Sequence, residues 1–161
     1  MNHNRKGAIG AILDEYSKAI VELQQLIKNI SPSDLSAIAD TTTTNPDCKS
    51  IQTVLTHVVS SGYSYAIYIQ ELKNPSTRIR QKNTRESVLE YSNDLNNVLA
   101  FTADVFSNFK DEELEELDDS KKIKTRWGQI YDIEQIMEHA IVHILRHRRQ
   151  IQKFKLLLQH K

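Results

Sequence analysis

The chain has 161 residues, which is enough for one domain with a substantial hydrophobic core, and we expect residues 1–161 to form a single domain. Its 21 Lys and Arg residues balance its 21 Asp and Glu residues. Its one cysteine, Cys48, excludes an internal disulfide framework. The sequence has neither a signal-peptide pattern nor the roughly 18-residue apolar run of a membrane span. We therefore expect a cytoplasmic protein that binds neither nucleic acid nor membranes.

Strand signals are almost missing, whereas apolar residues recur at three- and four-residue spacing in several long segments. The first such segment predicts a helix over residues 6–29. A short helical turn at 33–38 and a threonine-rich loop at 40–48 follow, because threonine, asparagine and proline are poor residues for a helix interior. The second long helix is predicted over 50–72.

The third long helix is predicted over 84–109, with Thr84 as its N-cap. A charged connection follows, with one helical turn at 111–117. The dipeptide Trp127-Gly128 is expected to place an aromatic lid over one end of the molecule.

The fourth long helix is predicted over 132–159, opened by a capping box in which Asp132 pairs with Gln135. A helix of about 24 residues is about 36 Å long. Four helices of that length match an all-α four-helix bundle, which is the fold that we predict.

The last helix carries three of the six histidines, His139, His143 and His147, at intervals of four residues. His143 and His147 fall on a stripe that alternates spacings of three and four, as a bundle helix does on its inward face. His139 lies about 40° further round the helix than His143 and about 80° from His147. The predicted inward stripe consists of Ile133, Ile136, Ala140, His143, His147, Gln150, Phe154 and Leu157.

Two imidazoles at positions i and i+4 can bind one metal ion, and catalytic zinc sites commonly use three protein ligands. The candidate for the third ligand is His57 on the second helix, where Ser61 and Gly62 would leave room beside the metal. The pair His143 and His147 has another interpretation that the residues leave open. Both can be buried histidines that hydrogen-bond to carboxylates or to the backbone.

Other metal motifs do not fit. A metalloprotease motif needs a glutamate directly after the first histidine, where Ala140 and Ile144 stand, and the glutamate spacing of a di-iron bundle is absent. His3 and His160 lie near the chain ends, where ligation is not expected. One mononuclear site is therefore predicted.

The residues around this site also leave alternatives open. His139 either lies beside the metal ligands, where it could act as a proton carrier, or is a solvent-facing side chain, and Glu138 is another candidate helper. The candidate tyrosines on the second helix can equally be ordinary packing residues; they are Tyr63, Tyr65 and Tyr68. The acidic run 111–119 and the basic run 146–155 are most simply solvated faces, and otherwise the surfaces of an interaction module.

"LTHVV" on the second helix and "TRWGQIYDIEQIMEHAIVHILRHRRQI" on the fourth resemble the DinB/YfiT-like family of metal-dependent enzymes, a family of four-helix bundles distinct from the DNA polymerase of the same name. The resemblance extends over about residues 8–157. It implies a divalent metal ion, Zn or Ni, bound by three histidines that fall on His57, His143 and His147. The stripe on the fourth helix selects the same pair.

The resemblance further implies a low-molecular-weight thiol S-transferase, with a small thiol and an electrophile as substrates, and a homodimer is plausible. A metal-dependent hydrolase and a non-catalytic metal-binding or interaction bundle are the alternatives. The chain departs from many members at Arg149, where a glycine is common, and near Cys48, where a tryptophan is common.

Overall fold

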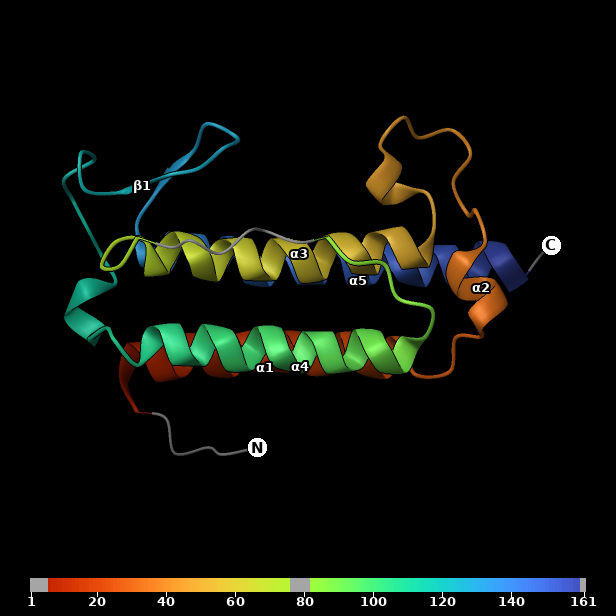
Figure 1. Cartoon of the computed structure of the whole chain (residues 1–161), viewed down its shortest axis with the longest axis horizontal. Helices are drawn as coiled ribbons and strands as arrows, with labels where there is room; N and C mark the ends of the chain where they lie inside the picture. Colours follow the sequence, from red (N-terminus) through yellow and green to blue (C-terminus); the bar gives the residue numbers. More distant parts are fainter. Residues whose placement is uncertain (1–5, 76–81, 160–161) are drawn as a thin grey trace.

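In the computed structural model, which describes residues 6–75 and 82–159, four long helices pack side by side (Figure 1). The predicted four-helix bundle is confirmed. The long helices are α1 (Gly7–Ile27), α3 (Ile51–Gln70), α4 (Val88–Phe106) and α5 (Ile133–Gln159). The short elements are α2 (Pro32–Ser36), η1 (Pro46–Cys48), η2 (Asp111–Glu113), β1 (Ile123–Lys124) and β2 (Ile130–Tyr131). His3 and His160 lie outside the described residues.

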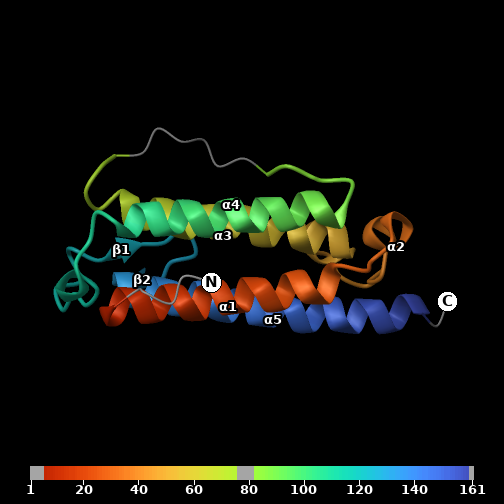
Figure 2. The same ribbon diagram turned by 90° about the horizontal axis from the view of Figure 1, so that it is seen from below.

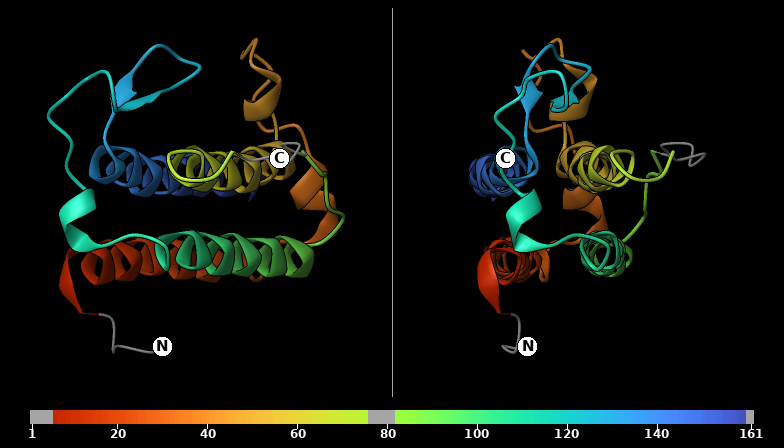
Figure 3. Two further views of the ribbon diagram at one scale, coloured as in Figure 1. Left: turned by 60° about the vertical axis from the view of Figure 1, so that its left-hand side comes forward. Right: turned by 90° about the vertical axis from the view of Figure 1, so that its left-hand side faces the viewer.

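The helices occupy the corners of a square in cross-section (Figure 3). α1 and α3 lie on one diagonal and α4 and α5 on the other, since α1 and α3 each contact both α4 and α5. α1 and α5 run in one direction, whereas α3 and α4 run in the other (Figure 2). The helices α3 and α5 are therefore antiparallel neighbours.

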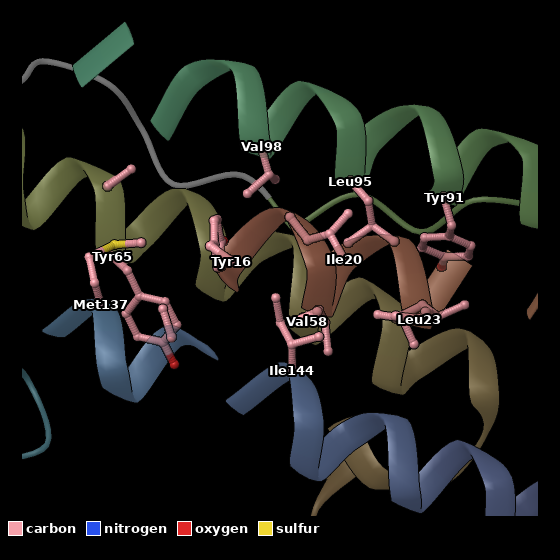
Figure 4. Close-up of a cluster of buried hydrophobic side chains, with 14 of the residues drawn as sticks. Tyr16, Ile20, Leu23, Val58, Tyr65, Tyr91, Leu95, Val98, Met137 and Ile144 are labelled. Atoms are coloured by element: carbon pink, nitrogen blue, oxygen red, sulfur yellow. The ribbon is translucent and has the colours of Figure 1, made fainter. Parts of the chain in front are cut away.

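The core lies between the four helices and is filled by aliphatic and aromatic side chains (Figure 4). α1 contributes Ile20 and Leu23, α4 contributes Leu95, and all three are at most 1% exposed. Each long helix buries one face in this way, which is the main source of its stability because isolated helices of this length are marginal in water.

Gly62 faces this core rather than the predicted metal site, so its predicted role was wrong. A Cβ atom at this position would lie 2.6 Å from Val98 Cγ1 and 3.1 Å from the Tyr16 hydroxyl. The glycine therefore lets α3 approach α4 closely.

Helix ends follow local capping chemistry. The predicted capping box of α5 is confirmed, since Asp132 N donates to Gln135 Oε1 and Gln135 N donates to Asp132 Oδ1. The predicted N-cap of the third helix was wrong, because α4 begins after Ser87, whose hydroxyl accepts from Glu90 N while the Glu90 carboxylate accepts from Ser87 N. Because Ser87 and Glu90 each accept a hydrogen bond from the other's backbone N, they form a capping box, which is a stronger helix start than a cap at Thr84 alone.

Two connections rise over the side of the bundle formed by α3 and α5 (Figure 1). One is the segment that carries η1, which packs against α3. The other is a small antiparallel hairpin of β1 and β2, whose turn contains Gly128 at a φ of 88°. The sequence had not predicted this hairpin.

Within the described residues, none of the helices combines the length and apolar character that crossing a membrane requires.

A buried hydroxyl joins α3 to α4. The Tyr91 side chain is 0% exposed, and its Oη accepts from Arg85 N at 3.1 Å and donates to the Gln52 carbonyl oxygen at 3.1 Å. The Thr56 hydroxyl also bonds to it, 2.5 Å away. These bonds attach the start of α4 to the first two turns of α3, next to His57.

We expect Tyr91→Phe to lower the free energy of unfolding by about 1–2 kcal/mol, because it leaves buried polar groups without their partner. Urea unfolding followed by circular dichroism measures this. In a double-mutant cycle, Thr56→Val combined with Tyr91→Phe should cost less than the sum of the two single changes. Strict additivity would show that the two hydroxyl groups do not interact.

Candidate metal centre

The position of each histidine on α5 follows from the helix period. Successive residues are rotated by about 100°, and the centre of the buried face lies about 65° from His143 and about 25° from His147. Accordingly, His147 is only 7% exposed, whereas His143 is half-buried. The buried residues of α5 are Ile133, Ile136, Met137, Ala140, Ile144, His147, Ile151 and Phe154.

The predicted inward stripe was therefore rotated away from the true core. It omitted Met137, Ile144 and Ile151, which are buried, and it included Leu157, which is 42% exposed. The histidines consequently lie at the edge of the core on the face toward α3, and not in the centre of the bundle. A site at this edge is accessible to small molecules.

The structure brings His57, His143 and His147 together from α3 and α5. His57 Nε2 lies 2.9 Å from His143 Nε2, and one ligand atom from each of the three rings lies within 4.8 Å of the others. The centroids of the His57 ring and the two α5 rings are 4.9 and 5.0 Å apart. Three imidazole nitrogens that converge in this way form a cluster that can hold a metal ion.

Two of the rings are held by contacts at their other nitrogen. His57 Nδ1 lies 3.4 Å from Asp47 Oδ2, and His147 Nδ1 lies 2.8 Å from Gln150 Oε1, to which it donates. These contacts orient the rings so that Nε2 faces the cluster. Metal-bound histidines commonly have such partners, which select the tautomer and the ring orientation.

Asp47 reaches His57 because η1 holds it over α3. Asp47 N donates to Asn45 Oδ1 at 3.0 Å, which caps this short turn, and Lys82 forms an ion pair with the Asp47 carboxylate. Sequence reasoning missed Asp47, since nothing in the segment "TNPDCKS" indicates which residue meets the second helix. Gln150 was on the predicted stripe, and its spacing of three from His147 could have identified it as a partner.

Burial keeps the three imidazoles neutral at neutral pH. It lowers the pKa of His143 to about 2, assisted by the neighbouring His147 and His57 rings. Burial also lowers the pKa of His57, against the opposing effect of Asp47, and that of His147, against the opposing effect of Gln150. The neutral form is the one that binds metals, and a set of three imidazoles suits zinc and nickel. The donor set therefore fits a divalent metal ion.

His139 lies outside the three-histidine cluster, in an aromatic group beside it. Its ring stacks on Trp127 at a centroid distance of 5.2 Å and an angle of 23°, and it lies 6.3 Å from the ring of His143. Tyr65 and Tyr131 also contact it, at 5.4 and 5.8 Å. The hairpin that carries Trp127 thus covers one side of the site.

The predicted helper residues separate into two groups. Tyr65 is buried beside His139 and 5.7 Å from the ring of His143, and burial raises its pKa to about 12. The other candidates lie away from the cluster: Tyr63 packs against Phe101, the Tyr68 hydroxyl accepts from Arg126 N, and Glu138 is exposed.

A cleft of about 660 Å³ opens above the cluster. Its lining includes His139 of α5 and Cys48 of η1. The further lining residues are Asn45, His57, Val142, His143, Arg146, His147, Arg149, Gln150 and Lys153. A small molecule that enters this cleft can therefore contact all three histidines of the cluster.

A family model described as the DinB family matches residues 1–154. The chain belongs to the DinB family. This confirms the resemblance drawn from the helix motifs, and the bundle described above is the fold of this DinB protein. No curated protein and no solved structure matches the chain.

Trp127 is the only tryptophan of this DinB protein, so its fluorescence reports on the aromatic group beside the site. Protonated imidazole quenches a stacked indole, and burial lowers the pKa of His139 below its usual 6.5. We expect the emission of the metal-free protein to fall as the pH decreases, with a midpoint below pH 6.5. A fluorescence titration in wild type and in His139→Asn measures this. A midpoint above that value, or an unchanged titration in the variant, would contradict the assignment.

Proposed function

We propose that this DinB protein is a metal-dependent enzyme in which His57, His143 and His147 bind one zinc or nickel ion. The enzyme joins a low-molecular-weight thiol to an electrophile within the cleft. The convergence of three imidazoles, two of them held at the far nitrogen by Asp47 and Gln150, carries this proposal. Membership of the DinB family supports it, because the resemblance to that family implies a three-histidine metal site on the same residues.

His57, His143 and His147 would hold the divalent ion, which would supply Lewis acidity and lower the pKa of a bound thiol. His139 borders the cleft and is neutral at neutral pH, so it is placed to accept the thiol proton. The sulfur then forms a bond to the electrophilic carbon, and the leaving group departs with the electron pair of the bond that breaks. The cleft wall formed by Cys48 and Asn45 would hold the electrophile beside the thiol.

We expect the purified protein, after loading with zinc or nickel, to contain one equivalent of metal by plasma mass spectrometry. His57→Ala, His143→Ala and His147→Ala should each lose it, because two imidazoles bind the ion far more weakly than three. His139→Ala is the matched control and should stay loaded, since its ring lies outside the cluster.

The outcomes distinguish the possible functions. Metal-dependent conjugation of a thiol to chlorodinitrobenzene, lost with the metal, would support the transferase. One equivalent of metal with ester hydrolysis instead would favour the hydrolase, and metal without either activity would favour a binding bundle. A wild-type protein that binds no metal would leave the three histidines as structural residues and would overturn the proposal.

Asp47→Asn should weaken metal binding by about tenfold, because loss of the carboxylate charge makes His57 a poorer ligand. Competition with a chromophoric chelator measures the dissociation constant. Asp118→Asn removes the same charge from an exposed turn away from the cleft and should leave the affinity unchanged. Equal affinities in wild type and Asp47→Asn would show that the contact with His57 does not influence the metal.

A further inference from the structure

The cleft above the histidines has a charge that the whole chain does not have. Three cationic side chains line it, those of Arg146, Arg149 and Lys153, and the residues that the structure describes contribute no carboxylate to the lining. The chain as a whole has a formal net charge of zero. The cleft is therefore locally positive. The basic run at residues 146–155 divides between the side of α5 that faces the cleft and the side that faces α1.

The helix period explains this division. Relative to His143, the positions of Arg146, Lys153 and Arg149 are rotated by about 60°, 80° and 120°, all away from the buried face. They form a stripe on the solvent side of the histidines. Progressing round α5, the faces are core, metal cluster and cations, in that order.

The other cations of the same run have partners elsewhere. Arg148 forms an ion pair with Glu22 of α1, and Lys155 Nζ donates to the Leu26 carbonyl oxygen at 2.9 Å. These two residues help to attach α5 to α1. Within residues 6–75 and 82–159, no ion pair involves the three cations of the cleft.

The carboxylates near the cleft are already bound to other groups. Asp47 contacts His57 and Lys82. The Asp40 carboxylate accepts from the hydroxyl and the backbone N of Thr42, which lower its pKa most, and the charge of Lys153 makes a smaller contribution. Arg146 and Arg149 therefore keep their charge available to a molecule that enters the cleft, and Lys153 shares its charge only in part, with Asp40.

We propose that the substrate of this site is an anion: a small thiol that carries carboxylate or phosphate groups, which bind Arg146, Arg149 and Lys153 while the sulfur lies at the three histidines. This inference rests on the proposed function and specifies its substrate class. The helical rise from His143 to Arg146 is about 4.5 Å, and from His147 to Lys153 about 9 Å. A thiol and an acidic group separated by a few bonds can span these distances, given the length of the arginine and lysine side chains.

The test uses cobalt(II)-loaded protein, in which a thiolate on cobalt gives a charge-transfer absorption band that reports binding directly. Mercaptosuccinate and its dimethyl ester are titrated as probes, since they differ in charge and share the thiol. We expect the acid to bind at least about tenfold more tightly than the ester at low ionic strength, and the preference to decrease as salt is added. Competition by succinate and by methyl phosphate, which lack a thiol, distinguishes a carboxylate site from a phosphate site.

The variant Arg146→Gln/Arg149→Gln/Lys153→Gln should bind cobalt as wild type does and should lose the preference for the acid. The matched control, Lys6→Gln/Lys18→Gln/Lys28→Gln, removes three exposed charges, one within α1 and one at each of its ends, none of which lines the cleft, and should keep the preference. Equal affinity for acid and ester in wild type, or a preference that survives in the cleft variant, would overturn this inference alone. Failure of wild type to bind cobalt, or to give a thiolate band with either probe, would overturn the proposed function and this inference with it.

Discussion

Antiparallel packing of α3 against α5 places His57 opposite a stretch of two turns on α5, and the rest of the site depends on this contact. The distance of 2.9 Å between His57 Nε2 and His143 Nε2 requires the two helices to keep their spacing and their axial register. A shift of one turn, about 5.4 Å, would separate the ligands completely. The surrounding core therefore has a functional role, because it holds that register.

The bundle maintains the register with features outside the cluster. Gly62 has no side chain and so lets α3 approach α4, and the Tyr91 hydroxyl joins the first turns of α3 to the start of α4. On α5, the buried residues Ile144 and Ile151 alternate with the histidines and fasten the same helix to the core. The stable core and the polar site thus lie on adjoining faces of one helix, and neither is compromised by the other.

Much of the fold could be predicted from the sequence, because amphipathic helices have a strong period and few competing signals. The capping box of Asp132 and Gln135 could be recognised from local residues alone, whereas the start of α4 was placed at Thr84 because several polar residues precede the true cap, Ser87. For the site, the four-residue spacing could predict that His143 and His147 share one face of α5. It could not predict how that face is rotated relative to the core. The exact direction of the core depends on how α5 packs against α1 and α3, which no pattern within a single helix contains.

The same limit applies to the partners of the histidines. His57 could be chosen because few other histidines lie within a helix, but Asp47 could not, since only the tertiary fold brings η1 over α3. That placement has an evolutionary consequence. The residue that orients His57 belongs to a connecting loop, whose length and composition can change without repacking the bundle. Related chains can therefore adjust how strongly the centre holds its ion by remodelling a surface loop, while the helices that carry the ligands stay as they are.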